Sequence, residues 1–511
     1  MSIEGDVRDE CDKLIKRFER YARELREEDN RRKTRTGVAK AGLIRRPSYW
    51  GVDNLFNPYK VRASAESISR AIRLGLANGD YRPYNSVLYE VPKSDGTHRA
   101  ISVFNIPDAA VSRRIYRSLL AKNKPRMSSY SYAYRDDLTV HDAIHHIASD
   151  FTGHRRMFIA EYDFSKYFDS IDHDYIWHII DEKKFFINSR ERQVLNAFMR
   201  TTPQSQNGYS RMSDIVEPQK RGIPQGTSIS LFLANIAAWE LDRALERLGV
   251  GFARYADDTL IWSADYSRIC DAVGTLADLG REMGVSINLE KSHGISIFTP
   301  DGSPAEMAPK SSVEFVGYSF SHNKTGMRKS VVTRIKQRLA YLIWSNLLEP
   351  LERGYFIPDR LQPGIDLDYL IMILQIRRYL YGNLTEERIA RLRSGEVARL
   401  NYPGVMSFFP SVDDIDQLKG LDGWLLHTVH TSLARRGRLL HELGVPALPT
   451  PHGLSREALL RASGEKPTGE AASLRLPSFV RMGTLIKAAA EAHGPNTIGR
   501  TGGPQHYQYA G

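Results

Sequence analysis

The stretch Tyr255-Ala256-Asp257-Asp258 places two carboxylates next to each other between two short apolar runs. Gly251-Phe252-Ala253-Arg254 precedes it and Thr259-Leu260-Ile261-Trp262 follows it, and both runs are typical of β-strands. The sequence therefore predicts a tight β-hairpin with both acids at its tip. Because adjacent carboxylates repel each other, such a pair is favoured where water screens it or a cation neutralises it.

A third acid, Asp163, follows the β-type run Met157-Phe158-Ile159-Ala160-Glu161-Tyr162. An acid at the end of one strand and an acidic pair on a neighbouring hairpin can converge on divalent cations. Two such ions stabilise both the attacking and the leaving oxygen of nucleotidyl transfer. Taken alone, Asp257 and Asp258 are equally well explained as a solvated turn. The upstream acid favours the metal-binding interpretation.

Between these acids lies the turn-forming segment Pro224-Gln225-Gly226-Thr227-Ser228. Glycine allows close approach of another molecule, and the hydroxyl residues after it suit the start of a helix. The run 231–241 that follows has the apolar pattern of a helix packed under a sheet. The segment therefore predicts a loop that a nucleotide can approach closely.

In this order and spacing, the segments resemble the motifs of the reverse transcriptases. The segment around Asp163 matches the first palm motif, Pro224-Gln225-Gly226 the second, and Tyr255-Ala256-Asp257-Asp258 the YxDD signature. Residues 286–292 are similar to the family's Asn-x-x-Lys-Thr segment, and residues 313–318 to its primer-gripping hairpin. The resemblance implies an α+β right-hand polymerase with fingers, a palm built on an antiparallel sheet, a helical thumb and a C-terminal extension.

The resemblance also implies which residues carry the chemistry. It assigns two Mg²⁺ ions, with Mn²⁺ as a substitute, to Asp163, Asp257, Asp258 and the main-chain carbonyl of Phe164. Lys291 would protonate the departing pyrophosphate as a general acid. The alternative for Lys291 is an ordinary exposed charge.

Substrate-binding roles follow from the same matches. Residues 91–101 are similar to the fingers hairpin, whose Lys93 and Arg99 would meet the incoming triphosphate. Phe168 stands where the family places its steric gate against the ribose 2′-hydroxyl; alternatively it packs in the core and Tyr167 faces the site. The remaining expected contacts are Gln225 near the sugar and base, Tyr255 and Ala256 near the primer terminus, and Phe315 and Gly317 in the primer grip.

Composition agrees with a polymerase but does not specify one. Among 511 residues, 71 Lys and Arg exceed 60 Asp and Glu, and the net charge of +11 suits a polyanionic partner. The two cysteines, Cys11 and Cys270, form no ligand cluster, as expected for a reducing cytosol. Since no apolar stretch is long enough to cross a bilayer, we expect a cytoplasmic protein without membrane contact.

The pattern along the chain predicts five regions. They are an N-terminal helical and connector region (1–80), fingers (81–152), palm (153–321, with a return to the fingers near 183–220), a helical thumb (322–443) and a C-terminal accessory tail (444–511). The segment Arg328-Lys329-Ser330 at the thumb entry resembles the stand-alone bacterial reverse transcriptases of the "unknown group", many of which serve antiphage defence. The absence of a Cys/His nuclease cluster after the thumb disfavours a mobile group II intron enzyme.

The resemblance therefore predicts a stand-alone reverse transcriptase that uses dNTPs and a dedicated non-coding RNA template to make DNA. Two other classes of function stay open: an RNA-binding assembly or abortive-infection scaffold with a vestigial palm, and an untemplated or protein-primed polymerase. In the last case Tyr507 or Tyr509 would supply the priming hydroxyl. An RNA-dependent RNA polymerase is disfavoured because those enzymes usually carry Gly-Asp-Asp. The sequence leaves the oligomeric state open, a homo-oligomer included.

Overall fold

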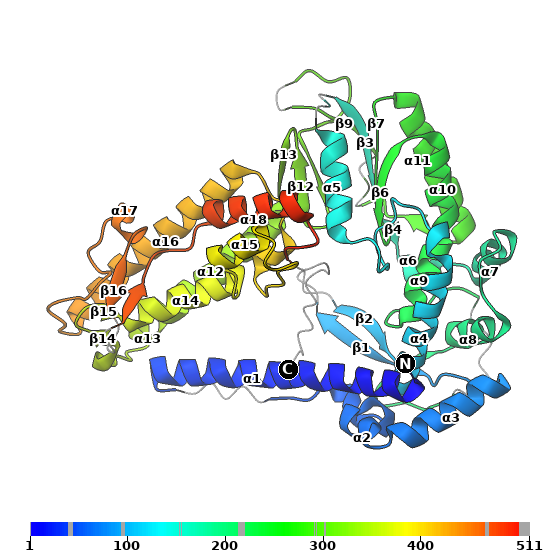
Figure 1. Ribbon diagram of the computed structural model, residues 1–511, viewed down its shortest axis with the longest axis horizontal. Helices are drawn as coiled ribbons and strands as arrows, with labels where there is room; N and C mark the ends of the chain where they lie inside the picture. The colour runs from blue at the N-terminus through cyan, green and yellow to red at the C-terminus, as the bar shows by residue number, and fades with distance from the viewer. Residues whose placement is uncertain are drawn as a thin grey trace.

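The computed structural model describes residues 2–38, 44–92, 98–152, 154, 156–212, 220–290, 292, 294–300, 303–465 and 470–499. Its palm is a five-stranded sheet in the order β10-β9-β3-β7-β6 (Figure 1). The strands are β3 (Met157–Tyr162), β6 (Gly251–Tyr255), β7 (Asp258–Ser263), β9 (Ile295–Phe298) and β10 (Pro309–Lys310). The pairing from β9 to β6 is antiparallel, as expected, but the edge strand β10 runs parallel to β9.

The palm sheet separates two hydrophobic cores because side chains alternate between its faces. Ile159 and Leu260 point into the core that is shared with the thumb. Ala160 and Ile261, one residue further along each strand, point into the core that is shared with the fingers. The alternating side chains that predicted these strands therefore also pack the palm against both neighbouring regions.

Helices cover both faces of the palm sheet (Figure 1). On the thumb side lies α5 (Val140–Phe151), which begins with a capping box formed by Thr139 and Asp142. The other face carries α9 (Ser228–Ala237), α10 (Trp239–Leu248) and α11 (Tyr266–Met283). Short elements link the sheet to these helices: β4 (Phe164–Ser165), α6 (Tyr167–Ser170), α7 (His173–Glu182) and β8 (Ser286–Ile287).

The fingers are built on a second sheet in the order β2-β1-β5. Strand β1 (Ser86–Pro92) pairs antiparallel with β2 (His98–Val103) and parallel with β5 (Pro203–Gln204). The segment between the palm motifs thus comes back to the fingers through β5. The surrounding helices are α2 (Pro58–Ala63), α3 (Ala65–Asn78), α4 (Ile106–Asn123) and α8 (Ser189–Met199).

A three-stranded meander leads from the palm into the thumb. It consists of β11 (Ser312–Phe315), β12 (Tyr318–Ser321) and β13 (Lys324–Met327). The thumb helices are α12 (Lys329–Leu347), α13 (Glu349–Glu352), α14 (Leu367–Tyr381), α15 (Glu386–Arg393) and α16 (Ile415–Glu442). Between α13 and α14 lies the small hairpin β14 (Leu361–Gln362) and β15 (Ile365–Asp366).

Residues 444–511 were expected to form an accessory tail, but the described parts of this region, 444–465 and 470–499, pack into the thumb core. They form α17 (Arg456–Leu459), the hairpin of β16 (Ser463–Glu465) and β17 (Ala471–Ser473), and α18 (Phe479–His493). Phe479 and Ile486 of α18 are buried in the same core as Leu418 and Leu425 of α16. The Pro- and Gly-rich composition here reflects turns between packed elements.

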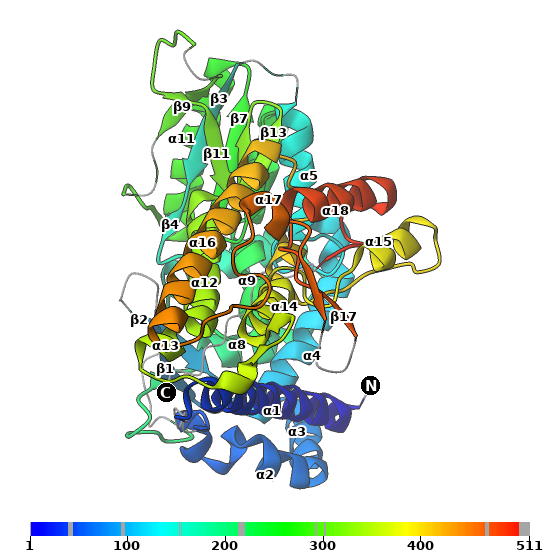
Figure 2. The same cartoon turned by 90° about the vertical axis from the view of Figure 1, so that its left-hand side faces the viewer.

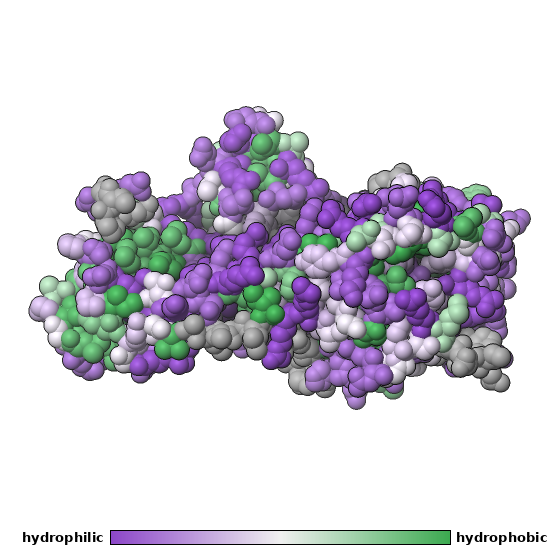
Figure 3. Space-filling model, turned by 90° about the horizontal axis from the view of Figure 1, so that it is seen from below, coloured by the Kyte–Doolittle hydropathy of each residue, from purple (hydrophilic) through white to green (hydrophobic). Residues whose placement is uncertain are grey.

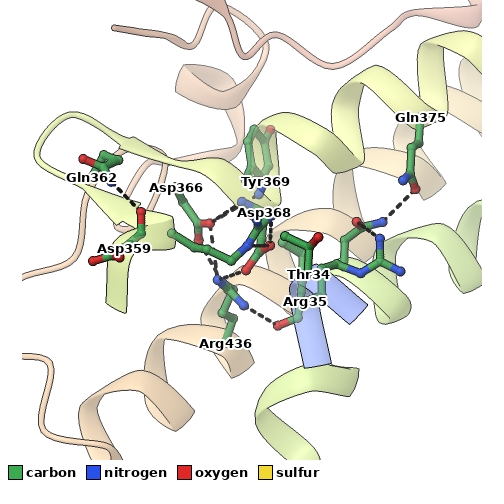
Figure 4. A network of polar contacts seen from close by, with 12 residues as sticks. Thr34, Arg35, Asp359, Gln362, Asp366, Asp368, Tyr369, Gln375 and Arg436 are labelled. Carbon is green, nitrogen blue, oxygen red and sulfur yellow. Dashed lines mark hydrogen bonds and ion pairs between the residues drawn. The ribbon is translucent and has the colours of Figure 1, made fainter. Parts of the chain in front are cut away.

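A buried network of charges holds together the end of the thumb that lies away from the palm sheet (Figure 4). The Arg436 guanidinium of α16 donates to both Asp366 (2.8 Å) and Asp368 (2.8 Å), and to the carbonyl of Leu347 (2.9 Å). His452 lies 2.9 Å from the Asp366 carboxylate. Burial alone would raise the pKa of Asp366, but Arg436 and His452 lower it to about 2. The network joins four separate chain segments.

The first helix, α1 (Ile3–Thr36), spans the molecule beneath the palm (Figure 1). Ser2 caps its start and Gly37, at φ 67°, ends it. Its 34 residues reach about 51 Å, from the fingers helices to the thumb. The helix therefore bridges the two ends of the hand.

The end of α1 is fitted closely to the thumb. Arg35 is buried and donates to Asn346 of α12 (3.2 Å), and Arg32 pairs with buried Glu349 (3.0 Å). A Cβ on Gly37 would lie 2.2 Å from the Tyr355 ring, so only glycine fits this contact. Since α1 also packs against α2, α3 and α4 of the fingers, palm, thumb, α1 and fingers form a continuous ring of contacts. Figure 2 shows the molecule from the thumb side.

The underside of the molecule is largely hydrophilic, and apolar side chains gather mainly at the end where the thumb lies (Figure 3). Among the described residues, no helix combines the length and the apolar character needed to cross a membrane. Both cysteines are unpaired thiols, and Cys11 is buried.

We expect Arg436→Met to lower the free energy of unfolding by about 3–5 kcal/mol, because it leaves the Asp366 and Asp368 carboxylates buried without their partner. The difference in stability between wild type and variant should be smaller in acid. The ionised carboxylate of Asp366 stabilises the fold above its unfolded pKa near ~4, and this stabilisation is lost as the pH falls through its folded pKa of about 2. Chemical denaturation at neutral and acidic pH measures both effects.

The matched control is the neighbouring Arg435→Met, whose side chain is 57% exposed and pairs with Glu352 at the surface. It should cost no more than about 1 kcal/mol. Equal destabilisation by the two variants would show that the buried network does not stabilise the thumb.

Candidate active site

The acidic hairpin forms as the sequence predicts. Tyr255 of β6 pairs with Asp258 of β7, so Ala256 and Asp257 make a two-residue turn. Ala256 adopts a left-handed conformation (φ 64°), which costs roughly 1–2 kcal/mol for a residue with a Cβ. Surrounding contacts must hold this strained turn in place.

Asp163 lies beside the hairpin because of strand register. Tyr162, the last residue of β3, pairs with Thr259 of β7, so the next residue, Asp163, lies next to Asp258. The backbone of Asp163 is held on its other side, where its carbonyl accepts from the N–H of Asn288 (2.8 Å) and its N–H donates to Ser292 Oγ (3.4 Å). The three acids of the sequence prediction are therefore brought together.

The electrostatics of the hairpin reflect this crowding. Desolvation by the surrounding protein, followed by repulsion from Asp163, Asp257 and Glu161, raises the pKa of Asp258 to about 7, although its side chain reaches solvent. Arg328 opposes this shift. A divalent cation would favour the ionised form and reverse the shift.

Carboxylate oxygens are the ligands that Mg²⁺ and Mn²⁺ prefer, so the donor atoms of Asp163, Asp257 and Asp258 fit such an ion. Within the described ranges, no three His, Cys, Asp or Glu side chains form a complete metal cluster by themselves. In proteins, Mg²⁺ usually binds one or two carboxylates together with substrate phosphates.

The Pro-Gln-Gly segment connects the palm to the fingers sheet. The Gln225 carbonyl accepts from the Ser102 N–H of β2 (3.0 Å), and its side chain donates to Asp169 (3.0 Å). Gly226 has φ 119°, and a Cβ there would lie 2.1 Å from the Ser102 carbonyl oxygen. Glycine is required here because the fingers backbone passes too close for a side chain. Thr227 then caps α9.

The two aromatic candidates for the sugar gate occupy different environments. Tyr167 is 2% exposed, and its hydroxyl donates to the Ala234 carbonyl of α9 (2.7 Å). Phe168 is half-buried and packs edge-on against Tyr167 and Tyr134. Phe168 therefore has the greater access to solvent of the two. Phe164, the expected carbonyl donor, has a buried side chain and pairs with Ile287 through its backbone.

The expected primer grip is a tight hairpin between β11 and β12. Phe315 pairs with Tyr318, and the turn residues Val316 (φ 44°) and Gly317 (φ 84°) are both left-handed. This conformation is strained for β-branched Val316. The Phe315 side chain is 2% exposed, so it supports the hairpin from within the core. Arg328 donates its N–H to the Gly317 carbonyl (2.9 Å).

Several expected contacts fall outside the described residues. These are Lys93, Lys291, Tyr507 and Tyr509. For Arg99 only the backbone is described, in β2 opposite Val91. Of the described residues near it in the sequence, Asn288 and Ser292 bond to the backbone of Asp163.

Arg254 is a residue of the site that the sequence analysis did not single out. It is 1% exposed and binds the Asp242 carboxylate through two hydrogen bonds of 2.6 Å. It also donates to Ala256 O (2.9 Å) and Ser131 Oγ (2.7 Å). One feature of the sequence could have revealed Arg254: it is a cation at an inward-facing position of an apolar strand, directly before Tyr255.

The palm sheet with its acidic hairpin, the fingers strands and the helical thumb define a right-hand polymerase. Residues 91–320 match the family described as "Reverse transcriptase (RNA-dependent DNA polymerase)". The chain therefore contains a reverse transcriptase domain over these residues, as the motifs predicted, and the predicted fold class is confirmed.

Individual relatives are distant. The chain is 26% identical over 223 residues to Protein YkfC of Escherichia coli (strain K12), covering 43% of this chain and 55% of that protein. It is 28% identical over 173 residues to a COX1/OXI3 intron 1 protein of Saccharomyces cerevisiae, covering 34% of this chain and 19% of that protein. The chain thus spans about half, or less, of the curated relatives it matches.

Among solved structures, telomerase from Candida albicans in complex with a TWJ fragment of telomeric RNA is similar over 76% of this chain and 69% of that chain. The TM-score is 0.37 and the sequence identity 12%, a likeness too low to bear on function.

We expect Arg254→Lys to lower the rate constant of primer extension on the order of tenfold to a hundredfold with little change in the KM for nucleotide. Lysine keeps the charge opposite Asp242 but cannot also hold the Ala256 carbonyl, so the acids lose their alignment. Steady-state kinetics separate the two constants. Arg247→Lys, at an exposed site paired with Glu240, is the control; a change confined to KM would contradict a positioning role.

Proposed function

We propose that this chain is an RNA-directed DNA polymerase that extends a 3′-hydroxyl with deoxynucleotides on an RNA template. The observation that carries the proposal is the position of Asp163 beside the Asp257–Asp258 hairpin, inside a reverse transcriptase domain. In the reaction, the 3′-oxygen bonds to the α-phosphorus of a dNTP, the bond to the β-phosphate oxygen breaks, and pyrophosphate leaves.

The three acids and the Phe164 carbonyl would hold two divalent cations, Mg²⁺ or Mn²⁺. Such ions supply charge stabilisation to the attacking and leaving oxygens. The chain itself contributes alignment: β-sheet register fixes Asp163 against Asp258, and Arg254 holds the turn between Tyr255 and Asp258. Lys291 would give a proton to the pyrophosphate as it leaves.

Selection of the nucleotide would fall to the residues around the Pro-Gln-Gly loop. Phe168 stands partly open beside Tyr134 and would crowd a ribose 2′-hydroxyl. Gln225, fixed by Ser102 and Asp169, would meet the sugar and base. Lys93 and Arg99 would bind the triphosphate.

Primer contacts would come from the hairpin tips. Tyr255 and Ala256 would lie near the primer terminus, and Phe315 would hold the Val316–Gly317 turn from inside the core so that backbone groups meet the primer strand. The net charge of +11 favours binding of RNA and DNA strands and predicts that this binding weakens with salt.

The template would be a dedicated non-coding RNA, and the setting bacterial antiphage defence. This part rests on the resemblance of the Arg328-Lys329-Ser330 thumb entry to stand-alone bacterial enzymes. Sequencing the nucleic acid that co-purifies with the protein tests it: one discrete RNA with complementary DNA supports the proposal, and a mixture without complementary DNA contradicts it.

We expect Asp257→Asn/Asp258→Asn to reduce primer extension on an RNA template about a thousandfold or more. Stabilisation by the ions amounts to several kcal/mol, and each 1.4 kcal/mol is tenfold in rate. Asp271→Asn, at an exposed position of α11, is the matched control and should extend primers normally. Extension at the wild-type rate by the double variant would favour an RNA-binding scaffold over an enzyme.

We expect Phe168→Ala to reduce discrimination against ribonucleotides on the order of tenfold to a hundredfold, since it removes the ring that would meet the 2′-hydroxyl. The ratio of kcat/KM for a dNTP and the matching rNTP measures the effect. Phe186→Ala, at a side chain that is 59% exposed, is the control. An unchanged ratio would contradict the role of Phe168 as a steric gate and would indicate that it only packs in the core.

A further inference from the structure

A pocket of about 670 Å³ opens in the thumb, outside the group of acids. Its walls come from α14, α15, α16 and α18, together with the segment that follows β17. These elements gather on the thumb side of the molecule (Figure 2). The volume lies within the range of pockets that bind small molecules.

The floor of this thumb pocket is apolar. Leu384, Leu425, Leu476 and Met482 line it and are buried. Leu460 stands at its wall and is 45% exposed. A flat apolar group could therefore leave water by entering the pocket.

Four arginines line the same pocket: Arg377, Arg461, Arg475 and Arg481. They face two acids, Glu386 and Asp422. Positive side chains therefore outnumber negative ones around the apolar floor.

The two acids do not neutralise the positive charge of the four arginines. Asp422 is occupied by the start of α18, because it accepts from Ser478 Oγ (2.7 Å) and from the N–H groups of Phe479 (2.6 Å) and Val480 (3.2 Å). Glu386 pairs with Arg481 and lies 3.9 Å from Arg475. One carboxylate thus serves two arginines.

The other two arginines have no carboxylate partner within the described part of the chain. Arg377 donates to the Arg475 carbonyl (2.6 Å) and to Ser473 Oγ (3.1 Å), which are neutral acceptors. Burial, and then repulsion from Arg475 and Arg481, lowers the pKa of Arg377. An anion placed among these side chains would relieve this repulsion.

We propose that the thumb pocket binds a nucleoside phosphate, with the base on the leucine floor and the phosphate between Arg377 and Arg461. The apolar floor suits the face of a base, and guanidinium groups bind phosphate through paired hydrogen bonds. A free nucleotide and a single unit of an RNA strand share this chemistry. The site is separate from the acids of the palm and does not depend on their reaction.

The test measures binding of ATP, dATP, inorganic phosphate and a short oligoadenylate to the full chain by calorimetry in EDTA. Arg377→Gln/Arg461→Gln should weaken the nucleoside phosphate at least about tenfold, since two charge-assisted contacts are lost. Arg393→Gln, exposed on α15 and outside the pocket, is the matched control. Arg461→Glu, at an exposed site, reports on the pocket without endangering the core.

The probe whose binding is weakened by the pocket variants identifies the source of the ligand. Weaker ATP and dATP binding assigns a free nucleotide, whereas weaker binding of the oligonucleotide alone assigns a unit of RNA. The proposal is overturned if no probe is weakened by the pocket variants, or if inorganic phosphate binds as tightly as ATP. Asp257→Asn/Asp258→Asn should leave this binding unchanged, so loss of polymerase activity and failure of the pocket proposal are separate results.

Discussion

The buried ion pair between Arg254 and Asp242 is the contact around which the catalytic half of the palm is organised. Arg254 links the start of the acidic hairpin to α10 through Asp242, to α9 through Asn235 (3.3 Å), and to the loop at Ser131. Its bond to the Ala256 carbonyl fixes a turn whose left-handed conformation is unfavourable by itself. A fully desolvated guanidinium is stable here because every one of these partners is in place.

Strand register explains how three mutually repelling acids share one corner of the sheet. Asp163 and Asp258 are brought together by strand register and by backbone hydrogen bonds, so the fold can hold them close without neutralising them. Desolvation, followed by this repulsion, raises the pKa of Asp258, and a divalent cation bound there would lower it. Rigid backbone elements, more than side-chain pairing, therefore set the geometry of the site.

Longer-range contacts fix the parts of the hand relative to one another. The α1 helix contacts the thumb through Arg35 and Gly37, and at its other end it contacts the fingers through the ion pair of Asp6 with Arg114 of α4 (2.7 Å). The Arg436 network ties the thumb helices to the turn that receives α1. Residues 444–499 add to the thumb core and form one wall of its pocket.

The sequence by itself determined the local features: the hairpin with Asp257 and Asp258 at its end, the strand before Asp163, and the glycine at Gly226. Each depends on residues adjacent in the chain, where period-two patterns and turn chemistry are informative. Tertiary structure decided the rest. The partners of Arg254 and Arg436, the docking of α1 and the arginines of the thumb pocket lie far apart in sequence, and a single charged residue does not reveal which distant group will neutralise it once both are buried.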